Sequence, residues 1–169
     1  MDVIQAIRTR RSVRAYDARP IPEAVMQRMK DALRLAPSAC NSQPWQYIIV
    51  KDRNTLNDIM EVHPYTGMLN TANMAIIVCG EPQEGMPKPY WAQDCAASTQ
   101  NILLEAKELG IGSCWCGVYP YNERVGPIRK LFKIPDEIYP FCVIALGYPA
   151  EEKPPNNRYI EDKIHNEKW

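Results

Sequence analysis

Two short apolar stretches constrain the fold of this chain more than any other feature. Residues 75–79 read Ala-Ile-Ile-Val-Cys, and residues 141–146 read Phe-Cys-Val-Ile-Ala-Leu. Both are far shorter than the roughly 20 apolar residues of a membrane-spanning helix, and both have the length of buried strands. Since residues 75–79 are apolar on both faces, we expect this strand to lie at the centre of a sheet.

Segments with helical spacing of apolar residues alternate with these strands. We expect further strands over residues 46–50 and 113–118, and helices over residues 2–9, 22–36, 54–60, 91–109 and 122–132. Asn54 is the expected cap of the third helix, and Gly110 should end the fourth because glycine tolerates the left-handed conformation. The fifth helix begins at Asn122 or only at Pro127. No repeat or linker interrupts the chain, so residues 1–169 should form one domain.

The overall charge argues against partners that are held by charge alone. Lys and Arg total 20, as do Asp and Glu, whereas a nucleic-acid-binding protein is usually basic. We therefore expect no nucleic acid partner and, without a long apolar segment, no membrane association. The N-terminus lacks the apolar core of a signal peptide, so we expect a cytoplasmic protein.

The cysteines raise the questions of metal binding and redox chemistry. In a reducing compartment they should be free thiols. A zinc site is the alternative, but one residue separates Cys114 from Cys116, and the chain has two histidines. We therefore expect no metal. A redox relay through this pair would need solvent access and a lowered thiol pKa, and two small buried side chains are the simpler reading.

An arginine-rich segment follows the first expected helix. Four arginines and Ser12 lie within residues 8–14 of a chain that has no net charge. Each guanidinium offers a planar fork of donors that matches two phosphate oxygens. Residues spaced by two point the same way in an extended segment, so Arg10, Ser12 and Arg14 can converge on one phosphate. A solvated basic turn is the alternative.

Two further segments present small or polar residues at the ends of expected elements. The loop 36–45 is stiffened by two prolines and offers Ser38, Asn41 and Gln43 as hydrogen-bonding groups, although it could simply cap its neighbours. Residues 110–117 read Gly-Ile-Gly-Ser-Cys-Trp-Cys-Gly, and glycines allow a flat or charged group to approach the backbone. This segment lacks the spacing of a dinucleotide fingerprint.

The C-terminal segment 148–169 is polar and rich in proline, yet it carries Tyr159, Ile160, Ile164 and Trp169. A solvated tail would not need these apolar residues. They could pack on their own subunit, but we favour a segment that embraces a partner subunit.

Four segments occur in the order and spacing of the nitroreductase family: Arg-Arg-Ser-Val-Arg at 10–14, Pro-Ser-Ala-Cys-Asn-Ser-Gln-Pro-Trp at 37–45, Gly-Ile-Gly-Ser-Cys-Trp at 110–115 and Ala-Leu-Gly-Tyr-Pro at 145–149. The chain resembles FMN-dependent nitroreductases over nearly its whole length. The resemblance implies an α+β fold with a mostly antiparallel central sheet flanked by helices. It also implies an intertwined homodimer, with FMN at the subunit interface and residues 148–169 extending onto the partner.

The resemblance further implies which residues hold FMN. Phosphate and ribityl contacts fall to Arg10, Arg11, Ser12, Arg14 and, in the C-terminal segment, Lys153 and Arg158. The segment that meets the flavin from the other subunit matches Pro37, Ser38, Ala39 and Asn41, with Gln43 as a further candidate. Asn70 lies near a second family contact, and Trp115, Cys116 and Gly117 match the strand end beside the flavin.

The implied activity is reduction of nitroaromatics, quinones or related small conjugated electron acceptors by NAD(P)H, in a ping-pong cycle. Flavin carries the hydride chemistry, so we expect no catalytic side chain. Alternatives are a different flavin reaction, such as dehydrogenation, dehalogenation or flavin breakdown, or a non-catalytic flavin-binding module. Only a loop rich in Pro and Gly separates Cys79 from Tyr90, so the substrate lid should be small or open. We expect Asp94 and Glu105 to be solvated or at an interface.

Overall fold

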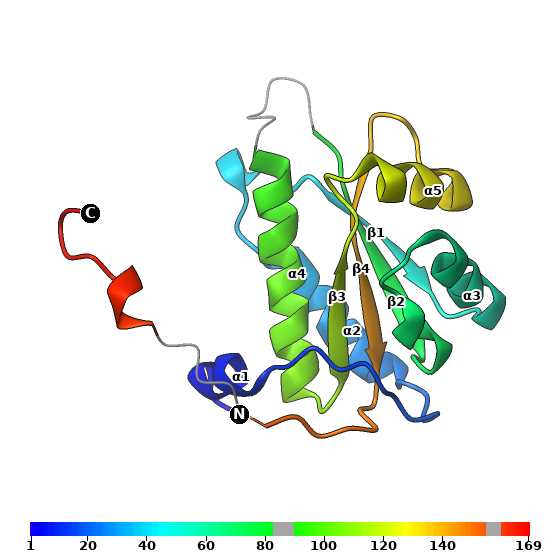
Figure 1. The fold of residues 1–169 in the computed structure, drawn as a ribbon, viewed down its shortest axis with the longest axis horizontal. Coiled ribbons are helices and arrows are strands. Elements are labelled where there is room, and N and C mark those ends of the chain that lie inside the picture. Colours follow the sequence, from blue (N-terminus) through cyan, green and yellow to red (C-terminus); the bar gives the residue numbers. More distant parts are fainter. Residues whose placement is uncertain (83–89, 155–159) are drawn as a thin grey trace.

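A four-stranded antiparallel sheet separates two layers of helices in the computed structural model, which describes residues 1–82, 90–154 and 160–169 (Figure 1). The strand order is β1 (Trp45–Val50), β2 (Met74–Gly80), β4 (Tyr139–Gly147) and β3 (Gly112–Gly117). On one face lie α2 (Glu23–Arg34) and α4 (Trp91–Glu108), and on the other lie α3 (Arg53–Val62) and α5 (Asn122–Phe132). The short α1 (Val3–Thr9) packs against α4. The expected α+β fold with an antiparallel sheet is confirmed.

The central strand β2 explains why the sheet is covered on both sides. All of its residues are buried, and it pairs with β1 on one edge and β4 on the other. Ile76 packs among the α2 and α4 side chains, whereas Ile77 packs among those of α3 and α5. Since each fully buried aliphatic side chain contributes about 1.5–3 kcal/mol, a strand that is apolar on both faces requires both helical layers.

The helices lie where they were expected, with one correction at the cap of α3 and one in the burial of Asp94. Asp52, not Asn54, caps α3, because its side chain accepts a hydrogen bond from the Thr55 amide at 2.9 Å. The helix α5 begins at Asn122 and contains Pro127. Asp94 is buried rather than solvated, since it accepts a hydrogen bond from the Ala39 amide at 3.0 Å. Within the described residues, no helix is both long and apolar enough to cross a membrane.

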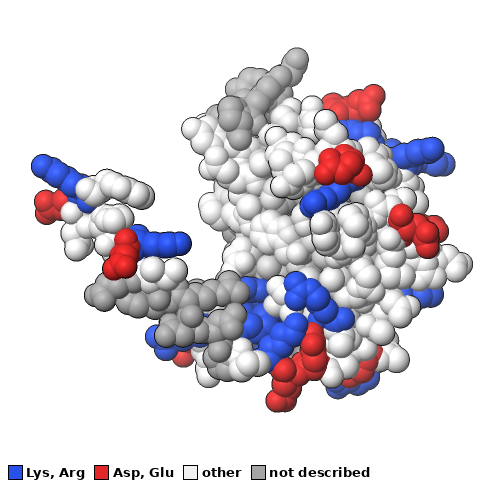
Figure 2. All heavy atoms as spheres, viewed as in Figure 1, with Lys and Arg blue, Asp and Glu red and all other residues white. Residues whose placement is uncertain are grey.

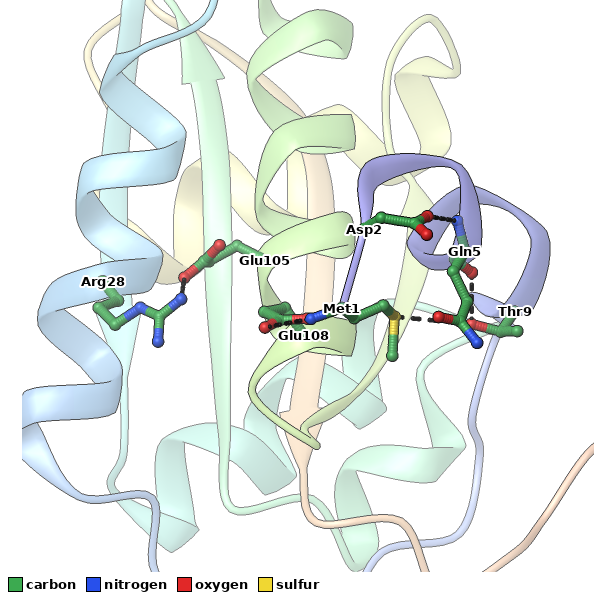
Figure 3. A network of polar contacts seen from close by, with 7 residues as sticks. All are labelled: Met1, Asp2, Gln5, Thr9, Arg28, Glu105 and Glu108. Carbon is green, nitrogen blue, oxygen red and sulfur yellow. Dashed lines mark hydrogen bonds and ion pairs between the residues drawn. The ribbon is translucent and has the colours of Figure 1, made fainter.

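Polar contacts attach α1 and α2 to the long helix α4 (Figure 3). The amino group of Met1 pairs with Glu108 at 2.8 Å, and Asp2 caps α1 by accepting a bond from the Gln5 amide. Arg28 of α2 pairs with Glu105 of α4 at 2.7 Å, so Glu105 is bound within its own subunit in this structure. These pairs fix α1 beside the start of the arginine-rich segment.

The arginine-rich segment lies along the outer edge of β3. Val13 donates its amide to the Ser113 carbonyl at 3.0 Å, and Tyr16 forms an isolated bridge with Pro149. A Cβ on Gly112 would come within 2.9 Å of the Val13 side chain, so glycine is needed for this approach. The buried Tyr16 hydroxyl donates to the Val13 carbonyl at 2.7 Å and closes the segment on itself.

We predict that Tyr16→Phe lowers the free energy of unfolding by about 1–2 kcal/mol, because the Val13 carbonyl loses a buried donor. Tyr121→Phe is the matched control, since Tyr121 is exposed, and it should change stability by less than about 0.5 kcal/mol. Urea denaturation of both variants measures the difference. Equal losses in the two variants would contradict the anchoring role of Tyr16.

Candidate functional site

Two cavities lie at opposite ends of β3, on either side of the arginine-rich segment. The first, called here the basic cavity, has a volume of about 370 Å³ and is lined by Thr9, Arg10, Arg11, Val13, Lys107, Gly110, Ile111, Gly112, Pro149, Glu151, Glu152 and Lys153. The second, the thiol cavity, has a volume of about 620 Å³ and is lined by Arg14, Tyr65, Gly67, Met68, Cys114, Trp115, Cys116 and Gly117. The strand between them spans about 17 Å from Gly112 to Gly117.

Charged groups dominate the basic cavity. Two arginines and two lysines line it, against the two carboxylates Glu151 and Glu152. Lys153 donates to the Ser12 carbonyl at 2.8 Å and pairs with Glu151 at 3.0 Å. Glu151 also accepts the Arg14 amide at 2.6 Å. Figure 2 shows basic side chains gathered where the C-terminal segment leaves the body. The cavity therefore carries an excess of positive charge that suits an anion.

Arg11, which lines the basic cavity, has incomplete hydrogen bonding. Its Nε donates to the Pro154 carbonyl, and its Nη1 donates to the Arg8 and Arg10 carbonyls. Its Nη2 is buried and has no partner among the residues that the structure describes. A buried charged donor without an acceptor costs more than about 1–3 kcal/mol, so an anionic acceptor in this cavity would be stabilised.

Two thiols from β3 form the floor of the thiol cavity. Cys116 Sγ donates to the Tyr65 carbonyl at 3.3 Å and lies 3.8 Å from Met68 Sδ. The neighbouring Cys116 thiol and the positive charge of Arg14 lower the pKa of the Cys114 thiol, whereas the neighbouring Cys114 and burial raise the pKa of the Cys116 thiol. Cys114 is only 2% exposed. Only one thiol of the pair therefore has a lowered pKa, and neither has the solvent access that a redox relay needs.

Two glycines leave the walls of the thiol cavity open. A Cβ built on Gly67 or Gly117 would meet no atom within 4 Å. Gly67 begins η2 (Gly67–Asn70), a short 3-10 helix whose backbone is held by Arg53 through the Leu69, Asn70 and Ala72 carbonyls. Arg53 therefore holds residues 69–72 behind this wall, while the space in front of Gly117 stays free.

His63 and Arg124 join the two walls behind this cavity. His63 is buried, its Nε2 donates to the Gly117 carbonyl at 3.0 Å, and its Nδ1 accepts the Tyr65 amide at 3.2 Å. A carbonyl can only accept and an amide can only donate, so the ring is neutral with its proton on Nε2. Burial lowers the pKa of His63 below its usual value, whereas the hydrogen bond to Gly117 raises it by less.

The loop that contains Pro37 lies elsewhere in the protomer. Residues 39–41 form η1 (Ala39–Asn41), a 3-10 turn at the N-terminal end of α4 (Figure 1). Gln43 donates its amide to Ser38 and its side chain to Asn41, each at 3.0 Å. The basic cavity lies by Lys107, at the other end of an 18-residue helix about 27 Å long. One protomer therefore does not bring this loop to either cavity.

The structure thus gathers part of the expected set. Arg10, Arg11 and Lys153 line the basic cavity, beside Ser12, and Arg14, Trp115, Cys116 and Gly117 line the thiol cavity. The Trp115 ring turns to the opposite face of the sheet, where it meets Phe141 at 5.7 Å. Asn70 adjoins the cavity-lining Met68 without lining the cavity itself, and Arg158 lies outside the described residues.

Several lining residues were missed. Glu151 and Lys107 in the basic cavity, and Tyr65, Gly67 and Met68 in the thiol cavity, carry no motif. Glu151 stands two residues before Lys153 in the sequence and could have been found as its ion-pair partner. No group of three metal-ligating side chains occurs among the described residues. Cys40 is exposed, whereas the other five cysteines are buried, and all six are free.

Comparison with known proteins gives consistent matches along the chain. The model of the nitroreductase family matches residues 7–64 and 62–148. A protein of Methanothermobacter thermautotrophicus named "Putative NADH dehydrogenase/NAD(P)H nitroreductase" is 47% identical, over 100% of this chain and 88% of that protein.

Solved structures agree in fold. An "FMN-dependent Nitroreductase" from Clostridium difficile R20291 matches with a TM-score of 0.91 and 27% identity, over 98% of this chain and 99% of that one. A "putative nitroreductase in complex with fmn" from Desulfovibrio desulfuricans matches with a TM-score of 0.86 and 25% identity, over 100% and 98% of the two chains.

The neutral state of His63 predicts a pH dependence of stability. Because its folded-state pKa is lowered from 6.5, its contribution is complete above that pH and is lost as pH falls through the folded pKa. Between pH 7 and 5, the free energy of unfolding should therefore fall less in His63→Gln than in wild type. The two slopes should differ by up to about 1.4 kcal/mol per pH unit. Urea titrations at several pH values measure this, with His165→Gln as the exposed control. Parallel curves for wild type and His63→Gln would refute the assignment.

Proposed function

Because this chain belongs to the nitroreductase family of oxidoreductases, we propose that it binds FMN and uses NAD(P)H to reduce nitroaromatics, quinones or related small conjugated electrophiles. One observation carries the proposal. The basic cavity and the thiol cavity lie at the two ends of β3. The basic cavity holds a buried guanidinium nitrogen without a partner among the described residues, and the thiol cavity has open glycine walls. FMN is elongated, with a dianionic phosphate at one end and a flat ring system at the other.

The basic cavity fits the phosphate. Arg10, Arg11 and Lys153 supply charge-assisted donors, and the buried Arg11 Nη2 still needs an acceptor among the described residues. The Lys153–Glu151 pair also lines this cavity, so the phosphate would compete with Glu151 for the lysine. We assign Arg14, which lines the thiol cavity, to the middle of the cofactor.

The thiol cavity fits the ring system. Gly117 and Gly67 leave space where any other residue would place a side chain, so a flat group can approach the backbone of both walls. Arg14 at this cavity would stabilise negative charge that develops on the reduced ring, because a fixed positive charge in a dry site needs no reorganisation.

A second copy of the chain would complete the site. The loop with Pro37, Ser38 and Asn41 lies at one end of α4 and the basic cavity at the other, so an antiparallel arrangement of two α4 helices brings them together. The apolar side chains of Val3, Ile4, Ile7 and Leu35 are exposed around a groove between α1, α2 and α4. We assign this surface to a homodimer interface.

The C-terminal segment supports the same assignment. Residues 160–169 extend away from the body (Figure 1), and Ile160, Ile164 and Trp169 are exposed. Such apolar side chains need a partner surface, and we assign residues 148–169 to an embrace of the second subunit. The free state of all six cysteines agrees with a reducing compartment, so we place the protein in the cytoplasm.

When bound, FMN supplies the redox chemistry, taking electrons from NAD(P)H and passing them to the acceptor. The protein's part is to orient the ring between the two walls, to neutralise its phosphate and to exclude water. We propose that NAD(P)H and the acceptor occupy the thiol cavity in turn, giving ping-pong kinetics. The lid implied by residues 83–89 lies outside the described part of the chain.

We expect the purified protein to be yellow and to be bleached anaerobically by NADH or NADPH, with colour restored by menadione or a nitroaromatic. Stopped-flow absorbance near ~450 nm, where free FMN itself absorbs, measures both steps. A flavin that neither nicotinamide reduces would indicate a different flavin reaction. A protein that is colourless and cannot be reconstituted with FMN would refute the proposal.

Filling the space at Gly117 should exclude the cofactor. Gly117→Leu places a side chain in the thiol cavity without a steric clash, so FMN affinity should fall by about tenfold or more while the fold is kept. Gly126→Leu is the matched control, because a Cβ there also meets no atom within 4 Å but lies on α5. Quenching of FMN fluorescence on binding measures both. Equal affinity in the two variants would place the ring elsewhere.

Removing one positive charge should weaken the hold on the cofactor. Arg14→Ala is expected to lower FMN affinity by about tenfold or more, since a hydrogen bond to a charged group is worth about 1.5–3 kcal/mol. Arg19→Ala serves as control, because Arg19 pairs with Asp17 and stacks on Tyr148 instead. Titration at two salt concentrations measures the loss, and an unchanged affinity in Arg14→Ala would remove Arg14 from the site.

A further inference from the structure

We propose that His63 and Arg124 are positioning residues that set the width of the thiol cavity by tying the Gly117 carbonyl on one wall to Tyr65 on the other. Both walls come from separate elements, β3 on one side and residues 65–68 on the other. The inference rests on the proposed function, because it takes this cavity to be the place of the flavin ring.

His63 makes the first tie. It is the C-cap of α3, and it is 1% exposed. Its Nε2–H donates to the Gly117 carbonyl at 3.0 Å, and its Nδ1 accepts the Tyr65 amide at 3.2 Å. One rigid ring therefore connects the last residue of β3 with the backbone of the opposite wall, and it does so through backbone groups on both sides.

Arg124 makes the second tie from another element. Its Nη1 donates to the same Gly117 carbonyl at 3.1 Å. Its guanidinium lies over the Tyr65 ring at 4.9 Å and over the Tyr121 ring at 4.3 Å, within the range of cation–π attraction. The same two walls are thus joined again, this time through the side chain of Tyr65.

The two ties meet at the Gly117 carbonyl, next to Cys116, whose thiol makes a third contact between the walls at the Tyr65 carbonyl. Gly117 has no side chain, and its Cβ position faces open space, so only its backbone can be restrained. In an antiparallel strand the N–H and C=O of one residue point to the same side, and successive residues of β3 point alternately toward β4 and toward the free edge. The Gly117 carbonyl is on the free edge, since it accepts from His63 and Arg124, whereas the Val118 amide donates to Phe141 of β4.

A fixed separation matters for a flat ligand. A ring held between two backbone walls gains full contact only when the gap matches its thickness, because dispersion falls steeply over 0.5–1 Å. Loosening either tie lets residues 65–68 move away from β3. We therefore expect FMN to bind more weakly and its flavin ring to be held less tightly, although neither His63 nor Arg124 contacts the ring with its own side chain.

The first measurement is amide hydrogen exchange on the full-length protein as purified. In His63→Leu, the Tyr65 amide loses its acceptor and should exchange at least about tenfold faster than in wild type. Arg129→Met, the matched control for Arg124→Met on the same helix α5, should leave this exchange unchanged, because Arg129 bonds to the Pro135 carbonyl and faces the Tyr139 ring. Unchanged exchange at Tyr65 in His63→Leu would overturn the proposal at its structural step.

The second measurement is FMN binding and the shape of the bound flavin's visible band. His63→Leu and Arg124→Met should each weaken FMN by about tenfold, and the double variant by much less than the product, because both act on one carbonyl. His63→Gln and Arg124→Lys retain a donor and should recover part of the affinity and the wild-type band. Arg129→Met should match wild type in both.

The outcomes separate this inference from the proposed function. Suppose that wild-type protein binds FMN and is reduced by NAD(P)H. If folded His63→Leu and Arg124→Met then match it in FMN affinity and in the shape of the flavin band, the positioning role alone is overturned. Strictly multiplicative losses in the double variant would also overturn the shared action through Gly117. A wild-type protein that takes up no FMN would overturn the proposed function, whereas the exchange at Tyr65 still tests the tie.

Discussion

The pairing of the N-terminal segment with the edge of β3 is the contact on which the rest of the site depends. A single backbone hydrogen bond from Val13 to Ser113, closed by the buried Tyr16 hydroxyl, lays a run of arginines along a strand whose two ends open into cavities. Without it, the arginines would remain close in the sequence, but nothing would hold them along β3 between the two cavities. Glu151 reinforces the arrangement, because it accepts the Arg14 amide and pairs with Lys153.

Much of the fold was predictable, and the physical reason is visible in β2. A strand that is apolar on both faces has to be central, and the helical spacing on either side of it has to supply two covering layers. Helix ends were predicted less well. Asp52 competes with Asn54 for the cap of α3, and the sequence shows both as good capping residues. The burial of Asp94 depends on the Ala39 amide, 55 residues away.

The site shows the same division. The arginine-rich segment and the strand end at Gly117 are contiguous motifs, so their residue types indicated an anion and a flat group. Tyr65 and Met68 were missed because they reach the cavity only through contacts with β3 across about fifty residues. Neither His63 nor Arg124 stands in a motif, and their common target is a backbone carbonyl, which no side-chain pattern reveals. The dimer assignment comes from the separation of the Pro37 loop from the basic cavity, a distance that the length of α4 sets.

The exposed thiol of Cys40 has a practical use. Burial raises the pKa of the Cys79 and Cys142 thiols to about 12, so these two stay protonated and unreactive at neutral pH. Cys40 lies in the turn that we assign to the subunit junction, with a positive φ of 52° and its side chain open to solvent. An environment-sensitive dye on this position would report on the proposed assembly, because its emission should rise if two protomers associate through this turn and fall again on dilution.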